Sequence, residues 1–215
     1  MRPLTLQNLQ LEARLFADQL SDTRIKALFG TTDGKAIGTH VEQAFINWLA
    51  VKYSFERGNA AKGIDLPDVN VDIKVTSITQ PQSSCPFRSA RQKIFGLGYS
   101  LLLFVYAKTD EAKSKSAKLE IQHVIFIAAK HTADYTLTRS LCDMLERGAN
   151  EEDLVALMQD RNLPLDDIEA GTIARELLEQ ALEKGFLTIS NALQWRLQYG
   201  HAIQEAGSTD GLVRL

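Results

Sequence analysis

Asp65, Asp72 and Lys74 place two carboxylates and an ammonium within ten consecutive residues. The residues on either side of 67–70 favour β-strands, and 67–70 supply proline, aspartate and asparagine, which form turns. If 67–70 close a four-residue hairpin loop, Asp65 stands directly opposite Asp72, with Cβ atoms about 4.5–5.5 Å apart. Lys74 lies on the same face as Asp72, because side chains two apart on a strand share a face. The spacing predicts three charged groups on one small patch.

The chemistry expected of this patch is hydrolysis of a phosphodiester. Facing carboxylates repel each other unless a cation lies between them, and Mg²⁺, a hard ion with oxygen ligands, fits that position better than zinc. Such an ion polarises the phosphodiester and holds the attacking water, while Lys74 orients or deprotonates that water. The simpler alternative is a surface ion pair on a solvated hairpin.

Asp68 is a rival for the first acid, because it follows Pro67 in a literal Pro-Asp pair. It falls inside the expected turn, where aspartate is a common turn former and its side chain would point away from Asp72. We therefore assign Asp65 as the first metal ligand and keep Asp68 as the alternative.

The surrounding elements are predicted from the period of their apolar residues. In chain order they are two short helices in 6–28, a helix in 39–53, hairpin strands in 63–66 and 71–77, a short helix from about Pro86 to Gly96 or Gly98, and strands in 100–106 and 120–128. Beyond 130 the pattern is helical to about 205. This order predicts an α/β fold with a mixed central sheet flanked by helices. We expect a core in 1–130 and a helical C-terminal subdomain in 131–215, packed as one globular unit.

This arrangement around Asp65 and Asp72-Ile73-Lys74 resembles the PD-(D/E)xK nuclease superfamily, especially type II restriction endonucleases. The resemblance covers about 39–106, a third of the chain. It implies a restriction-endonuclease-like fold in which Asp65 is the first acid and Asp72 and Lys74 belong to the D/E-x-K tripeptide. It also implies that Mg²⁺ is bound by Asp65, Asp72 and the main-chain carbonyl of Ile73.

Glu42 matches by position the glutamate that this family carries on the helix before the hairpin. The resemblance gives it a role in binding a second ion, or in holding a water of the first. A competing interpretation is a capping box, Thr39-His40-Val41-Glu42, in which Glu42 bonds back to the Thr39 amide. The sequence leaves both open.

Polar and basic residues just after the second strand of the hairpin are candidates for DNA contacts. On a helix, Arg88, Arg91 and Gln92 would share one face at i, i+3 and i+4. Arginine and glutamine read base edges and bind phosphate, and serine binds phosphate. The alternative for each residue is solvated polar surface. The full set is Gln80, Gln82, Ser83, Ser84, Arg88, Arg91, Gln92 and Lys93.

Charge is distributed unevenly along the chain. Residues 1–142 contain 18 Lys and Arg against 13 Asp and Glu, and residues 143–215 contain 6 against 14, so the two parts carry +5 and −8. A polyanion is attracted to the first part and repelled by the second, which places a nucleic-acid surface in the first.

The N-terminus lacks an apolar signal core, and the longest apolar run, 101–107, is too short to cross a bilayer. The two cysteines join no Cys/His cluster with zinc-site spacing. We expect a cytoplasmic protein with reduced thiols and no membrane role.

The sequence is thus expected to encode a hydrolase: an Mg²⁺-dependent endonuclease of double-stranded DNA, similar to the type II enzymes of restriction–modification systems. One catalytic trio per chain implies a homodimer on a palindromic site if both strands are cut. The alternatives are a nicking or repair nuclease of the same fold and a non-catalytic DNA-binding protein.

Overall fold

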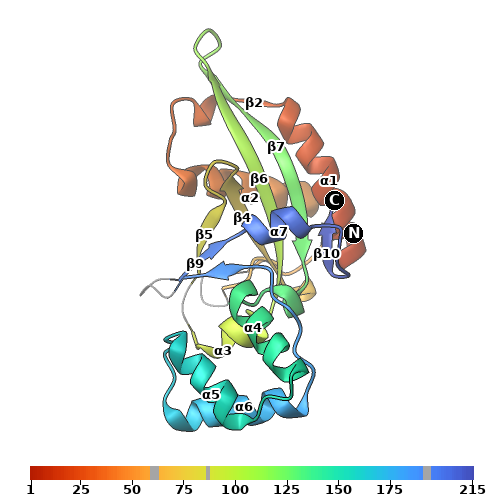
Figure 1. Cartoon of the computed structure of the whole chain (residues 1–215). Helices are drawn as coiled ribbons and strands as arrows, with labels where there is room; N and C mark the ends of the chain where they lie inside the picture. Colours follow the sequence, from red (N-terminus) through yellow and green to blue (C-terminus); the bar gives the residue numbers. More distant parts are fainter. Residues whose placement is uncertain (59–62, 86–87, 191–194) are drawn as a thin grey trace. The chain divides into compact units, whose positions relative to one another are not determined.

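The computed structural model describes residues 1–58, 63–85, 88–190 and 195–215, which form two compact units (Figure 1). Unit 1 contains Met1–Ser83, Tyr99–Ile127 and Ala206–Leu215, and unit 2 contains Ser84–Gly98 and Ala128–Glu205. The main crossing between units, after Ile127, falls near the predicted boundary at 130. Two segments lie in the other unit from the one predicted: residues 84–98 belong to unit 2, and residues 206–215 belong to unit 1.

Unit 1 is built on a mixed sheet of strand order β10-β7-β6-β4, with β2 also pairing with β7. The strands are β2 (Arg24–Ile25), β4 (Val71–Ser77), β6 (Ser100–Glu111), β7 (Ser116–Ile127) and β10 (Leu212–Arg214). β4 runs parallel to β6, whereas β7 is antiparallel to β6 and to β10. The predicted mixed sheet is confirmed. β6 and β7 extend beyond the facing ends of the predicted strands, 106 and 120, because cross-strand pairing continues as far as Glu111 and Ser116.

Two helices, α1 (Leu6–Asp22) and α2 (Gly34–Ala50), cover this sheet. Phe16 of α1 and Phe45 of α2 meet Phe104 of β6 with ring centroids 5.0–5.9 Å apart, so all three elements share one core. β6 is apolar and fully buried from Leu101 to Val105, as a strand covered on both faces requires.

A buried glutamate also joins the two helices. Glu12 of α1 accepts hydrogen bonds from Trp48 Nε1 at 2.8 Å and Lys52 Nζ at 2.7 Å, and from the hydroxyl of Tyr53 at 3.0 Å. Tyr53 lies in β3 (Tyr53–Ser54), which pairs with β1 (Arg2–Pro3). Although burial opposes ionisation, these donors keep the pKa of Glu12 below its usual value, so the carboxylate is a charged anchor for α2.

Several predicted boundaries are wrong. Residues 6–28 form one helix followed by β2 and a 3₁₀ turn, Lys26–Leu28, in place of two helices. α2 begins at Gly34, because the side chain of Asp33 caps it by accepting from the Lys35 amide at 2.9 Å. Residues 63–66 form no strand, and only Leu66 makes a bridge, to Val71.

Unit 2 is mainly helical, with α3 (Arg91–Phe95), α4 (Tyr135–Glu146), α5 (Glu151–Asp160), α6 (Asp167–Glu179) and α7 (Gly200–Glu205). The predicted start of a helix near Pro86 lies outside the described residues. The helical prediction up to residue 205 is wrong in part, since β8 (Thr188–Ile189) and β9 (Trp195–Gln198) join β5 (Gln82–Cys85) in a small sheet of order β5-β9-β8. In the described part of the chain, no helix is both long and apolar enough to cross a bilayer.

Candidate active site

Asp72 and Lys74 lie two residues apart on β4 and form an ion pair, with Lys74 Nζ 2.6 Å from Asp72 Oδ2. The side chain of Asp72 is 6% exposed and that of Lys74 is 21% exposed. Their strand is fixed by the parallel register of β4 and β6, in which Asp72 pairs with Leu101 and Lys74 with Leu103. A partly buried lysine beside a buried carboxylate is therefore built into the edge of the sheet.

Asp65 reaches the same patch from the segment before the turn. Leu66 and Val71 exchange backbone hydrogen bonds of 3.0 and 3.2 Å around the 3₁₀ turn Pro67–Val69, which is the register expected of the hairpin. Asp65 Oδ2 accepts a hydrogen bond of 2.8 Å from the backbone amide of Ile73. The carboxyl groups of Asp65 and Asp72 also share a hydrogen bond.

The surroundings of Asp65 raise its pKa to about 7. Burial is the largest cause, followed by the hydrogen bond to Asp72 and the repulsion between the two charges; the Ile73 amide opposes the rise, and the charge of Glu42 adds to it. Two acids that lie this close and raise the cost of each other's charge mark a position where a cation would relieve their repulsion.

The donor set fits a hard divalent ion. Within the described ranges, no three His, Cys, Asp or Glu side chains form a ready-made metal cluster, so two carboxylates would need oxygen ligands from the main chain, water or a phosphate. Mg²⁺ is usually held in this way, by one or two carboxylates and several waters. The Ile73 amide points to Asp65, and because a strand residue directs its N–H and C=O to the same side, the Ile73 carbonyl faces that edge too.

Glu42 lies inside α2, and its pKa is raised by burial and by the charge of Asp72, while Lys74 lowers it. It is therefore near enough to both residues to interact electrostatically. The capping box proposed for Thr39 and Glu42 is wrong, because the helix starts five residues earlier, at Gly34, and Asp33 is its cap. The interpretation of Glu42 as part of the acidic patch is the one that remains.

The rival acid, Asp68, is exposed, and its Oδ2 accepts a hydrogen bond of 2.7 Å from the backbone amide of Glu56. That bond attaches the turn to the segment that precedes residue 59. The contact favours a role for Asp68 in holding the turn and leaves Asp65 as the preferred ligand.

Gly58 lies against the backbone that carries Asp65, and the sequence analysis did not identify it. Its amide donates to the Asp65 carbonyl at 2.8 Å, and a Cβ at this position would lie 1.8 Å from the Ile64 carbonyl oxygen. Only glycine allows so close an approach of two backbones. The sequence carried no signal for this contact, because it joins segments separated along the chain.

The DNA-contact candidates in unit 1 lie on the turn after β4 and at the start of β5. Gln80 is exposed, and Gln82 and Ser83 are partly exposed. The buried hydroxyl of Thr76 lies 3.0 Å from both the amide nitrogen and the carbonyl oxygen of Gln82, and therefore fixes the return of this turn. Gln80 on the turn and Gln82 at the start of β5 are therefore held in place by Thr76.

The candidates in unit 2 differ from one another in accessibility. Ser84 and Arg88 are exposed, but Arg88 precedes α3, so the predicted shared helix face does not form. Arg91 pairs with Glu176 at 2.5 Å, and the side chain of Gln92 donates to the Leu97 carbonyl at 3.3 Å. Lys93 is buried, and burial lowers its pKa against the opposing charge of Asp134. Arg91 and Gln92 therefore bond to other residues of the protein, and Lys93 is buried.

A mixed sheet whose strand carries Asp-x-Lys beside a second acid from the segment before that strand defines the PD-(D/E)xK class of nucleases. The family model described as "Type II restriction enzyme NspV" matches residues 3–214. A curated relative, "Type II restriction enzyme NspV" from Nostoc sp. (strain ATCC 29411 / PCC 7524), is 54% identical over 213 residues, covering 99% of this chain and 97% of the relative. The chain belongs to this family of type II restriction enzymes. No solved structure matches it significantly.

Proposed function

We propose that this protein is a Mg²⁺-dependent endonuclease that cuts double-stranded DNA at a specific sequence, with Asp65, Asp72 and Lys74 as its catalytic residues. The single observation that carries the mechanism is the meeting of the Asp65 and Asp72 carboxyl groups beside the ammonium of Lys74, which lies 2.6 Å from Asp72 Oδ2. Membership of a restriction enzyme family supplies the reaction type.

Asp65, Asp72 and the Ile73 carbonyl would hold the ion, which supplies Lewis-acid activation of the phosphodiester and of a bound water. Lys74, fixed by its ion pair with Asp72, orients the attacking water and stabilises negative charge that develops on the phosphate. Glu42 holds a further water at the edge of the patch. Burial of these groups strengthens each of these electrostatic interactions.

The proposed substrate contacts are the exposed or partly exposed residues Gln80, Gln82, Ser83, Ser84 and Arg88. We do not include Arg91, Gln92 or Lys93 among the proposed DNA contacts, because they bond within the protein or are buried. One catalytic patch per chain supports a homodimer, since cutting both strands of a palindromic site takes two patches. Both cysteines are free, which supports a cytoplasmic location.

Digestion of a plasmid panel with and without Mg²⁺ tests the function, comparing the wild type with Asp72→Ala and Lys74→Ala. Discrete fragments that require Mg²⁺ and vanish in both variants are the expected result. Nicked circles alone would indicate a nicking enzyme, and DNA binding without metal-dependent cleavage would indicate a non-catalytic protein; either would overturn the proposal.

A further inference from the structure

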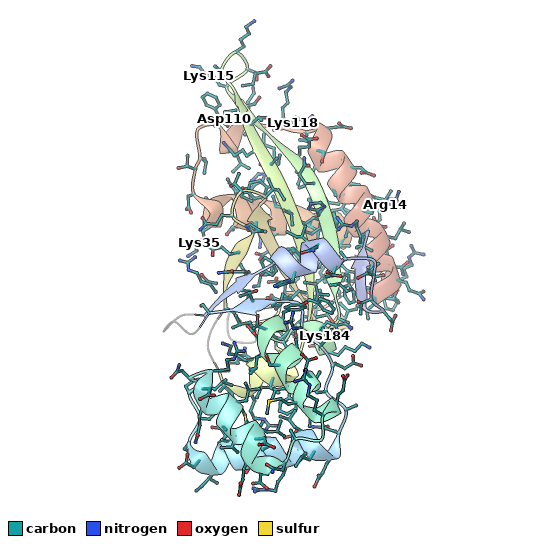
Figure 2. All side chains as sticks on the ribbon, viewed as in Figure 1. Arg14, Lys35, Asp110, Lys115, Lys118 and Lys184 are labelled. Atoms are coloured by element: carbon teal, nitrogen blue, oxygen red, sulfur yellow. The ribbon has the colours of Figure 1, made fainter. Side chains whose placement is uncertain are left out.

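β6 and β7 form a long two-stranded ribbon whose far end projects past α1 and α2 (Figure 1). β2 lies beside this end, with Arg24 opposite Lys118 and Ile25 opposite Ala117. We call residues 108–118 together with residues 24–26 the finger. Figure 2 shows Lys115 at its tip, with Asp110 and Lys118 on the strands below.

The acids of the finger are already paired. Glu111 forms an ion pair with Arg24 and accepts a hydrogen bond of 2.6 Å from Ser114, and Asp110 accepts one of 2.5 Å from Lys108. Four lysines have no acidic partner among the described residues: Lys26, Lys113, Lys115 and Lys118. Asp22 and Glu120 lie at the base, so the tip itself carries the positive charge.

The turn at the tip exposes Lys113, Ser114 and Lys115. Lys115 has a φ of 46°, in the left-handed region that glycine adopts without strain and other residues seldom adopt. The chain thus carries a cation at a position where local backbone preference favours glycine. An unfavourable backbone conformation of this kind suggests a function for the side chain.

The register of the sheet gives the distance from the catalytic patch to the start of the turn at the tip. Asp72 lies beside Leu101, and Glu111 follows ten residues further along β6. At about 3.3 Å per residue, Glu111 lies roughly 33 Å from Asp72 along the strand, and the tip follows directly after it. One turn of B-DNA spans about the same length, roughly 34 Å.

We propose that the finger binds the phosphate backbone of duplex DNA flanking the cleavage site, about one helical turn from the catalytic patch. This inference rests on the proposed function. A two-stranded ribbon is narrow enough to follow a major groove, and lysines at its tip bind phosphate without reading sequence. The finger therefore adds affinity and positions the enzyme, and the turn after β4 remains the candidate for base recognition.

The test compares the wild type with Lys113→Ala/Lys115→Ala and with a charge-matched control, Arg14→Ala/Lys184→Ala, whose exposed side chains belong to α1 and to unit 2 and not to the finger. Binding to a duplex of about 40 base pairs is measured by fluorescence anisotropy across salt concentrations. The variant loses two phosphate contacts per chain, or four in the proposed homodimer. Binding should therefore weaken about tenfold or more near 0.1 M salt and the salt slope should fall by about four, with no such change in the control. Equal slopes for the wild type and the finger variant would overturn the inference.

Flank length gives a second measurement, on duplexes that centre the mapped cut site between flanks of about 4 or about 20 base pairs, with Ca²⁺ replacing Mg²⁺. The wild type should bind the long duplex more tightly, and the finger variant should lose that preference while binding the short duplex as the wild type does. An unchanged preference in the variant contradicts the finger contact. The plasmid digest tests the proposed cleavage separately, and the salt slope can be measured without a cut site. The proposed function and the finger contact can therefore fail independently.

Discussion

The carboxyl group of Asp65 is hydrogen-bonded to that of Asp72, and the pKa of Asp65 is raised to about 7. A divalent ion held by the same two carboxyl groups would displace the proton that the raised pKa retains on Asp65, so proton and metal compete for the same oxygens. This competition makes metal binding the most direct measure of the site, independent of DNA.

We expect the affinity for Mg²⁺ to rise between about pH 6 and pH 8, with release of about one proton per ion at the lower pH. Titration calorimetry in buffers of different ionisation enthalpy measures both quantities. Asp65→Asn should bind the metal weakly and release no proton. Wild-type binding that is independent of pH in this range would contradict the raised pKa of Asp65.

The same shift has a consequence for stability. The folded pKa of Asp65 lies above its unfolded value of 3.8, so the folded protein retains a proton that the unfolded chain loses. Stability of the metal-free protein should therefore fall, at this site, as pH rises from about 4 to about 7. Thermal denaturation should show a larger stabilisation by Mg²⁺ at about pH 8 than at about pH 6, and Asp65→Asn should remove this difference.

Lys74→Ala should reduce single-turnover cleavage by about 10²- to 10⁴-fold, because the ammonium acts on the water and the developing charge. DNA affinity should change much less, since the side chain is mostly buried beside Asp72. A suitable control is Arg175→Ala, which removes an ion pair of equal length, 2.6 Å to Glu151, in unit 2. A similar loss of cleavage in the control would show that the effect is not specific to the patch.

Conservative substitutions test whether Asp65 or Asp68 is the metal ligand. In Asp68→Asn the amide oxygen still accepts from the Glu56 amide, so cleavage should stay near that of the wild type. Asp68→Ala loses this contact and should reduce cleavage a few-fold, which we attribute to a looser turn. Asp65→Asn should abolish cleavage, and an equally severe Asp68→Asn would instead identify Asp68 as the ligand. Cleavage rates at saturating Mg²⁺ measure all three.

Local features of the chain were predictable wherever short-range pattern decides structure. The buried strand around Leu101 follows from an apolar run, and the Leu66–Val71 pairing follows from turn formers between them. The start of α2 was missed because residues 30–34, with a glycine at each end, have the composition of a loop, although Asp33 caps the helix there. The partner of Arg91 is Glu176, which lies 85 residues away along the chain. The spacing of residues in the sequence therefore could not predict that this arginine is paired within the protein. The chemistry of the site is local in sequence, whereas access to it depends on tertiary contacts.

Gly58 provides a test of how Asp65 is held in place without altering any charged group. A Cβ at this position would lie 1.8 Å from the Ile64 carbonyl oxygen, so the backbone that carries Asp65 must move. Because catalysis depends on placement within about half an ångström, Gly58→Ala should reduce cleavage by about a hundredfold. The matched control is Gly34→Ala, where the added methyl group meets nothing within 4 Å.

For Gly58→Ala we further expect weaker Mg²⁺ binding, with a pKa of Asp65 closer to its ordinary value, because separation from Asp72 removes the bond and the repulsion that raise it. The proton released on metal binding should fall in parallel. Circular dichroism should show an intact fold, because the strained contact lies in the segment before β4 and outside the Phe16–Phe45–Phe104 core. Normal proton release combined with slow cleavage would show that the substitution acts elsewhere than on the Asp65–Asp72 pair.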